Sequence, residues 1–296
     1  MDVTIATCQN MPQPDRDEQP LLEALAAAGV EARLAAWNDE AVDWSVAPLT
    51  VVRSTWDYFD DRDAFVRWAQ RVSAASTVLR NPLSAIIPNT HKSYLAALER
   101  EELPVVPTRW FMAGGRPASP DVLRALPWRE VIAKPAIGGG SRGVRSFDLE
   151  VDEELEAAAA HVRELQQSGE VLVQPRLRSV AEEGERDIVW IDGEVTHVVH
   201  KFERMHGDEE QARSVSAPTE EDRLLVARVL RTLPAYDQSE LLYARVDAAR
   251  DELGTLRIIE VELVEPSLFL TMHEPALDRL VRALARGANL RVSQSS

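Results

Sequence analysis

The sequence is poor in cysteine and, relative to its acidic residues, poor in basic ones. Cys8 is the single cysteine among 296 residues, which excludes an internal disulfide framework and a cysteine-based metal site. We expect Cys8 to pack as a small buried apolar residue. The 33 basic residues are outnumbered by 49 acidic ones, for a formal net charge of −16. Without a basic field, the chain is not expected to bind nucleic acid.

Long apolar runs and a targeting segment are also missing. No uncharged apolar stretch approaches the roughly 18 residues of a membrane span, and no basic region followed by an apolar run opens the chain. We therefore expect a cytoplasmic protein with small-molecule partners and no membrane contact. Hydrophobic residues make up 45% of the chain, which suits two or three packed subdomains.

Apolar periodicity predicts an α/β fold in which the first part differs from the rest. Strands at Val3–Thr7 and Ala32–Ala36, with a helix over 19–28 between them, indicate a parallel α/β unit. Asn89 is a plausible N-cap for a helix running through Lys92 to about residue 100.

After residue 130 the pattern favours antiparallel hairpins, including one around Asp192-Gly193. The polar segment 203–218 is expected to be a loop. We predict an N-terminal substrate-binding lobe over 1–103, a central subdomain over 104–178 and a C-terminal subdomain over 179–296.

A glycine-rich segment follows the strand that ends at Lys134. Residues 138–143 are Gly-Gly-Gly-Ser-Arg-Gly, and glycines let backbone amides approach an anion closely. The Lys134 ammonium could reach an α or β phosphate. The spacing is not that of a P-loop, where lysine follows the last glycine, nor of a dinucleotide fingerprint, which opens a helix. A flexible hairpin without a ligand is the alternative.

Three carboxylates near the C-terminus have the spacing of a magnesium site. Glu260 and Glu262 are two apart on a predicted strand, so both face one side, and a hairpin would bring Asp247 beside them. Buried like charges repel without a cation, and Mg²⁺ prefers oxygen ligands. The alternative is an edge strand with a solvated acidic face. Arg245 would either pair with one of these carboxylates or reach a phosphate or the reacting carboxyl.

The first lobe holds a group of polar and aromatic residues that suits a small zwitterion such as an amino acid. The alternative for Trp56 and Tyr58 is packing at a lobe interface. The candidate substrate residues are Asp15, Asp17, Arg53, Ser54, Thr55, Trp56, Asp57 and Tyr58.

The order of these motifs resembles the ATP-grasp superfamily. In sequence they are Lys92, Pro-Val-Val-Pro-Thr at 104–108, Lys134 with its glycine loop, Val-Gln-Pro at 173–175, Arg-x-Asp at 245–247 and Glu-x-Glu at 260–262. A narrower likeness is to the glutathione-synthetase-type branch, which includes the O-ureido-serine cyclo-ligase of cycloserine biosynthesis. It is carried by Arg-Ser-Thr-Trp-Asp-Tyr at 53–58, Asn-Pro at 81–82, His-Lys-Ser-Tyr-Leu at 91–95, His-Val-Val-His-Lys at 197–201 and Glu-Leu-Val-Glu-Pro-Ser at 262–267.

The resemblance covers nearly the whole chain and implies ATP between two antiparallel sheets. Lys92 and Lys134 would contact its phosphates, and a loop containing Gly138, Gly139, Gly140, Ser141 and Gly143 would close over them. A hinge of Gln174, Pro175, Arg176 and Leu177 would face adenine, and Glu182 or Glu185 would accept from the ribose. Asp247, Glu260 and Glu262 would hold Mg²⁺, with Glu262 where most of the superfamily has asparagine.

The implied activity is an ATP- and Mg²⁺-dependent ligase. It would activate an amino-acid-like carboxylate or carbamoyl group as an acylphosphate, which an amine attacks to form a carbon–nitrogen bond. Lys201, Arg245 and Arg213 are the expected catalytic residues. The segment 206–216 departs from the Gly-Asp-Phe-Arg-type segment of relatives, and Arg213 is either the arginine of that segment shifted in register or a substitute for it. That departure leaves open a member that binds nucleotide without catalysis. An intramolecular cyclo-ligase is also open, as is a homodimer, since relatives are often dimers.

Overall fold

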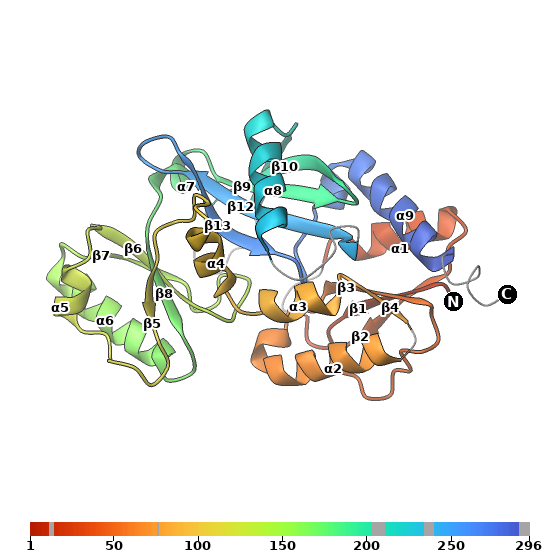
Figure 1. Cartoon of the computed structure of the whole chain (residues 1–296), viewed down its shortest axis with the longest axis horizontal. Coiled ribbons are helices and arrows are strands. Elements are labelled where there is room, and N and C mark those ends of the chain that lie inside the picture. Colours follow the sequence, from red (N-terminus) through yellow and green to blue (C-terminus); the bar gives the residue numbers. More distant parts are fainter. Residues whose placement is uncertain (12–14, 76, 203–210, 234–239, 290–296) are drawn as a thin grey trace.

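The computed structural model describes residues 1–11, 15–75, 77–202, 211–233 and 240–289. It contains three β-sheets with helices packed around them (Figure 1). The mixed α/β class expected from the periodicity is confirmed.

The first sheet is parallel and lies near both chain ends in Figure 1. Its strand order is β2-β1-β3-β4. Both of its faces are covered, because Val51 packs in the cluster that contains α1 and α9 residues while Val52 packs with α2. This two-sided burial explains why the central strands are nearly continuous apolar runs. The elements are β1 (Val3–Thr7), α1 (Glu18–Ala27), β2 (Ala32–Ala36), β3 (Leu49–Ser54), η1 (Tyr58–Asp60), α2 (Arg62–Ala74), β4 (Val78–Arg80) and α3 (Leu83–Asn89).

The second sheet is antiparallel, in the order β5-β8-β6-β7. It forms the left end of Figure 1 with α5 and α6. Leu155, Ala159 and Val162 of α6 pack against Val131 and Val171 of the strands. The elements are β5 (Arg109–Phe111), α5 (Pro120–Arg124), β6 (Glu130–Pro135), β7 (Arg145–Asp148), α6 (Asp152–Gln166) and β8 (Val171–Pro175).

The third sheet is antiparallel and five-stranded, in the order β11-β10-β9-β12-β13. One face packs on α8 and α4 through residues such as Val246 and Ile258. The other face is divided, because Tyr243 packs into the first-lobe core whereas Arg245 and Asp247 are polar. The elements are α4 (Tyr94–Arg100), α7 (Arg178–Glu182), β9 (Glu185–Ile191), β10 (Glu194–Phe202), β11 (Gln211–Ser216), α8 (Glu220–Thr232), β12 (Tyr243–Arg250), β13 (Leu256–Glu262), η3 (Leu270–Met272) and α9 (Glu274–Asn289).

The predicted helix through Lys92 is wrong. α3 ends at Asn89 and α4 begins at Tyr94, so Lys92 lies in the turn between them. The Asn89 side chain does not cap a helix. Instead, its amide group donates to the Val261 carbonyl at 2.8 Å and its oxygen accepts from the Leu263 amide at 2.7 Å. A long-range contact with β13 thus replaces the local cap expected from the sequence.

The loop predicted over 203–218 is corrected in part. Residues 203–210 lie outside the described part of the chain. Gln211–Ser216 forms β11, which pairs with β10 at the edge of the sheet. Its polar sequence fits an edge strand, where one side of the backbone has no neighbouring strand.

Each sheet lies within one of the three predicted segments, and the boundaries themselves stay a prediction. The C-terminal helix α9 is shared between lobes, since Leu280 and Leu284 join the core that contains Val3 and Leu49. Within the described ranges, no helix combines the length and apolar character that a membrane crossing requires.

Candidate active site

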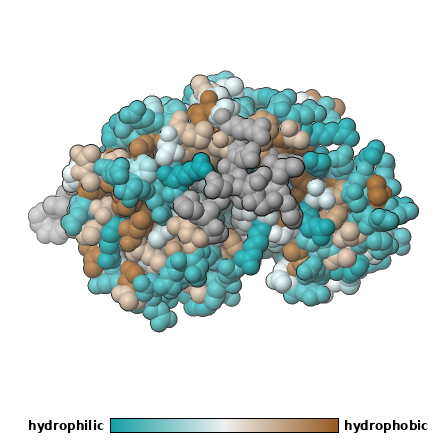
Figure 2. Space-filling model, turned by 180° about the vertical axis from the view of Figure 1, so that it is seen from behind, coloured by the Kyte–Doolittle hydropathy of each residue, from teal (hydrophilic) through white to brown (hydrophobic). Residues whose placement is uncertain are grey.

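A cavity of about 480 Å³ separates the β6–β7 hairpin from the polar part of the five-stranded sheet. In Figure 2, which shows the molecule from behind, a notch divides the end that carries β5–β8 from the remainder. The cavity brings together residues that are more than a hundred positions apart in the chain. The predicted site residues that line it are Lys92, Lys134, Gly138, Gly139, Gly140, Ser141, Gln174, Glu185, Lys201, Arg245, Asp247, Glu260 and Glu262.

The glycine loop adopts backbone angles that favour glycine. Gly140 and Gly143 have φ of 59° and 73°, values that L-residues rarely adopt. Gly143 does not line the cavity, and a Cβ added there would lie 3.4 Å from Leu165 and from Pro135. Its role is therefore to shape the turn beneath the loop.

Two lysines approach the cavity from different elements. Lys134 is 6% exposed, and its ammonium donates to the Ile259 carbonyl at 3.4 Å. Burial lowers the pKa of Lys134, against the opposing effect of Glu260. Lys92 donates to the Gly138 carbonyl at 2.7 Å and pairs with Glu260 at 2.9 Å. Lys92 thus links the glycine loop to the acidic strand β13.

A buried ion network occupies the opposite wall. Arg245 donates from Nε and Nη2 to the two oxygens of Asp247 at 2.7 and 2.8 Å, and from Nη2 to Glu262 at 2.5 Å. Asp247 lies opposite Glu260 in the β12–β13 register. Burial alone would raise the pKa of Asp247, but Arg245 and Lys201 outweigh it and hold that pKa below its usual value.

The sequence interpretation missed Asp187, the fully buried aspartate of this network. It lies on β9 directly opposite Asp247 on β12, and Lys201 donates to its Oδ2 at 2.9 Å. Burial, together with Asp247, raises the pKa of Asp187 well above its usual value. Oxygens of Glu185, Asp187 and Asp247 lie within 4.8 Å of one another. The signal available in the sequence was the position of Asp187, which shares one face of its strand with the apolar residues Val189 and Ile191.

Of the residues predicted to contact adenine and ribose, some line the cavity and others lie outside it. Gln174 lines the cavity and donates to the Thr108 hydroxyl at 2.8 Å. Arg176 instead pairs with Glu130 at 3.2 Å. Glu185 lines the cavity, whereas Glu182 lies exposed on α7. The remaining hinge residues, Pro175 and Leu177, do not line the cavity either.

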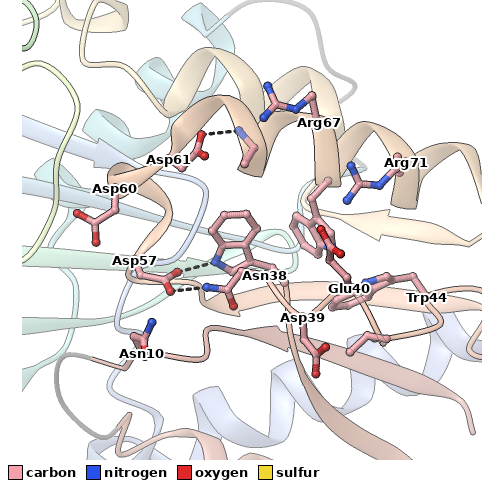
Figure 3. Close-up of a pocket in the computed structure, with 14 residues that line it drawn as sticks. Asn10, Asn38, Asp39, Glu40, Trp44, Asp57, Asp60, Asp61, Arg67 and Arg71 are labelled. Carbon is pink, nitrogen blue, oxygen red and sulfur yellow. Dashed lines mark hydrogen bonds between the residues drawn. The ribbon is translucent and has the colours of Figure 1, made fainter.

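Four of the predicted substrate residues have structural partners. The Trp56 indole donates to the Glu265 carbonyl at 2.9 Å. Asp57 accepts from the Trp37 indole at 2.6 Å and from the Asn38 amide at 2.8 Å, as Figure 3 shows. Tyr58 is buried against Phe59 and Phe65. Ser54 donates to the hydroxyl of Thr7 at 3.0 Å and to the carboxylate of Glu18.

The other substrate candidates carry buried polar atoms with no hydrogen-bond partner. These atoms are both Nη atoms of Arg53, Oδ2 of Asp17 and Oγ1 of Thr55. Arg53 is 2% exposed, and its guanidinium lies 5.1 Å from the centre of the Tyr243 ring. Burial raises the pKa of nearby Asp15 to about 6, although Arg53 opposes this. Arg213 belongs to β11, and its side chain lies outside the described part of the structure.

A second cavity of about 690 Å³ lies in the first lobe (Figure 3). Arg67 and Arg71 of α2 line one side, and the acidic residues Asp39 and Glu40 follow β2. Lysines and glycines are not among its lining residues, so it does not offer the phosphate contacts of the first cavity. Asp60 connects the two regions, because it lines this cavity and pairs with Arg142 of the glycine loop.

Comparisons with known proteins agree with this geometry. Residues 3–81 match the family model for the N-terminal domain of D-cycloserine synthetase DcsG. The chain is 33% identical over 287 residues to the cycloserine biosynthesis protein DcsG of Streptomyces lavendulae, over 92% of this chain and 93% of that protein. The crystal structure of D-cycloserine synthetase DcsG superposes with a TM-score of 0.85 at 31% identity, over 97% of this chain and 100% of that one.

More distant structures share the fold alone. The D-alanine–D-alanine ligase of Bacillus anthracis, complexed with ATP, superposes with a TM-score of 0.66 at 15% identity over 99% of both chains. The ATP-grasp ligase PsnB, solved with a minimal precursor, Mg and ADP, gives 0.63 at 17% identity over 97% of this chain and 98% of that one. With a relative this similar along nearly its whole length, the chain belongs to the ATP-grasp ligase family that includes D-cycloserine synthetase.

Proposed function

We propose that this protein is a Mg²⁺- and ATP-dependent ligase that converts a small amino-acid-like carboxylate or carbamoyl group into an acylphosphate. An amine then attacks the acylphosphate, a carbon–nitrogen bond forms, and ADP and phosphate are released. The observation that carries the proposal is the single cavity lined by Lys134 and the glycine loop on one wall and by Arg245, Asp247 and Glu260 on the other.

The residues of this cavity fit a nucleoside triphosphate. Lys92 and Lys134 would neutralise phosphate oxygens, and amides of the glycine loop would donate to them. Catalysis in phosphoryl transfer rests mainly on positioning and charge neutralisation. Arg245 would stabilise the transferred phosphoryl group or the reacting carboxyl, Lys201 would lie beside the nucleotide, and Arg213 would serve at the reacting end. Gln174 and Glu185 would contact the nucleoside.

The acidic wall fits a magnesium ion, because its donors are all carboxylate oxygens. Asp247, Glu260 and Glu262 would hold the ion, which would neutralise part of the negative charge of the phosphates. Asp247 and Glu260 are tied by the β12–β13 pairing, and Lys92 holds Glu260 at the cavity wall.

The unpartnered atoms of Arg53, Asp17 and Thr55 favour a zwitterionic substrate in the first lobe. A buried guanidinium without an acceptor is costly, and a substrate carboxylate would satisfy both of its Nη atoms. The Asp17 carboxylate would accept from an ammonium group. Arg53 stacks over Tyr243, and Arg245 follows Tyr243 on the same face of β12. A small substrate would therefore lie between the first lobe and the phosphates.

The test is a panel of amino acids and ureido amino acids, scored for ADP release and product mass. We expect substrate-dependent ADP release, and loss of at least about a hundredfold in kcat with Asp247→Asn or Glu260→Gln. Full turnover in both variants contradicts the mechanism. ATP binding without turnover on any panel member would instead favour a family member that has lost catalysis.

The similarity to D-cycloserine synthetase favours one particular version of this reaction, an intramolecular cyclo-ligase of the O-ureido-serine type. In that version the attacking amine and the activated carboxyl belong to one molecule. Product mass separates the two versions: a cyclo-ligase gives a cyclic product from a single amino acid, and an intermolecular ligase gives a product that joins two substrates.

A further inference from the structure

One oxygen of Asp187 is buried and has no hydrogen-bond partner. The side chain is 0% exposed, and its other oxygen accepts from Lys201 at 2.9 Å. An unpaired carboxylate oxygen in a closed interior is unfavourable. Lys201, Arg245 and Asp247, which lie around this carboxylate, line the cavity.

A second cation, Arg245, lies near the same carboxylate. Arg245 Nε lies 3.6 Å from Asp187 Oδ2, the oxygen that accepts from Lys201, while both oxygens of Asp247 are hydrogen-bonded by the same guanidinium. The β9–β12 register places Asp187 directly opposite Asp247. Arg245 therefore has two aspartates within reach, of which Asp247 is hydrogen-bonded to it and Asp187 is not.

The present pairing competes with the proposed metal role of Asp247. Each of its oxygens keeps a second lone pair, but the guanidinium already neutralises the carboxylate and would lie beside a bound divalent cation. Glu262, the other near acidic partner of Arg245, belongs to the same proposed ligand set, so cation binding would draw both carboxylates away from the guanidinium. A buried charge with too few partners is strongly destabilising, so a substitute anion is needed.

We infer that Asp187 is the alternate counter-ion of Arg245, and that the guanidinium shifts from Asp247 to Asp187 when Asp247 coordinates a divalent cation together with nucleotide. The planar fork of arginine can pair with either carboxylate, and the gap to be closed is less than one side-chain bond length beyond a hydrogen bond. Asp187 is therefore a positioning residue, and this inference rests on the proposed function.

The test measures Mn²⁺ affinity in the presence of ADP by electron paramagnetic resonance of free Mn²⁺. Asp187→Asn keeps the shape and removes the charge, so Arg245 stays on Asp247, and we expect the Kd for Mn²⁺ to rise about tenfold. The matched control is Asp222→Asn. Asp222 is 1% exposed and pairs at 2.7 Å with Arg186, the neighbour of Asp187 on β9, but it lies outside the cavity lining. We expect Asp222→Asn to leave the Kd for Mn²⁺ unchanged, although Asp187→Asn and Asp222→Asn both lose stability.

Two further measurements test the inference even if Asp187→Asn does not fold. Asp187→Glu keeps a carboxylate for Arg245, and its Kd is expected to stay within about threefold of wild type. In the wild-type protein, the Nε–H signal of Arg245 in ¹⁵N NMR should shift when Mg²⁺ and ADP are added. Where Asp187→Asn does fold, adding it to an Arg245→Met background should leave the Kd for Mn²⁺ unchanged.

The outcomes separate the two claims. Wild-type protein that binds no Mn²⁺ with ADP overturns the proposed function, and this inference with it. Wild-type binding with an unchanged Kd in Asp187→Asn overturns the inference alone. So does an equal loss in Asp222→Asn, or an Arg245 signal that does not move.

Discussion

At the scale of single residues, buried charge is concentrated around the cavity, and it displaces the pKa of Glu265. Burial, opposed by Lys92 and supported by Glu260, raises the pKa of Glu265 from 4.5 to about 8. A carboxyl whose pKa is higher in the folded than in the unfolded protein lowers stability at every pH at which it is ionised in the unfolded chain. The free energy of unfolding contributed by Glu265 therefore falls as pH rises from 4.5 to 8.

Glu265→Gln should remove this pH dependence. In metal-free protein, we expect the variant to unfold with a free energy about 1–2 kcal/mol above wild type at pH 8 and equal to it near pH 4.5. Urea denaturation at the two pH values measures the difference. A variant that is less stable than wild type at pH 8 would show that Glu265 is ionised in the fold.

The lysine, glycine and acidic residues of the site were predictable because each belongs to a short local pattern. Asp187 and Glu265 were not singled out, because their importance comes from strand neighbours. Asp187 faces Asp247 only because β9 pairs with β12, and sequence spacing does not give the order of strands in a sheet. The Arg245–Asp247 pairing was one open alternative among several, because spacing along β12 does not decide which partner a side chain takes.

At the scale of elements, the backbone shape of the glycine loop is predicted to support nucleotide binding. Gly143→Ala places a Cβ at φ 73° and 3.4 Å from Leu165 and Pro135. A strain of about 1–2 kcal/mol should raise the KM for ATP roughly five- to thirtyfold. Gly169→Ala is the matched control, because no atom lies within 4 Å of its added Cβ and its φ is ordinary. Equal KM values for both variants would contradict the role of the turn.

The contact between β10 and the segment before α9 predicts acid sensitivity. His197 is fully buried, its ring stacks on His273 at 4.7 Å, and its Nε2 lies 3.1 Å from the Leu268 carbonyl. Burial lowers the pKa of His197 from 6.5 to about 4. A histidine kept neutral by folding stabilises the fold above pH 6.5, and this stability is lost as pH falls toward 4.

We expect wild type to lose up to about 3 kcal/mol between pH 6.5 and 4 that His197→Gln does not lose. Chemical denaturation across this range gives the difference between the two proteins. A constant difference would mean that His197 does not titrate in this interval.

Element boundaries were predictable where local periodicity and packing agree, as in β1 and β2. The helix expected through Lys92 failed because Asn89 bonds to β13, and the loop expected at β11 failed because an edge strand needs little apolar sequence. Both errors arise from contacts between segments that are distant in the chain.

At the scale of the whole molecule, the first lobe contacts the glycine loop across the cavity. Arg142 pairs with Asp60, and its guanidinium lies 5.3 Å from the Phe59 ring. Both charged side chains are more than half exposed, so the pair is expected to contribute under about 1 kcal/mol. A double-mutant cycle with Arg142→Ala and Asp60→Ala, read from the KM for ATP, should show a coupling of about twofold to fivefold. Strict additivity would mean that the lobe does not assist loop closure.

The central claim is that the β6–β7 hairpin and the β12–β13 hairpin form the two walls of one site for ATP and Mg²⁺. Isothermal titration calorimetry with a non-hydrolysable ATP analogue tests it most directly, with wild type, Lys134→Met and Asp247→Asn. We predict one Mg²⁺-dependent binding event in wild type and a loss of about tenfold or more in affinity from a substitution in either wall. No heat in wild type, or binding indifferent to one of the walls, would contradict the account.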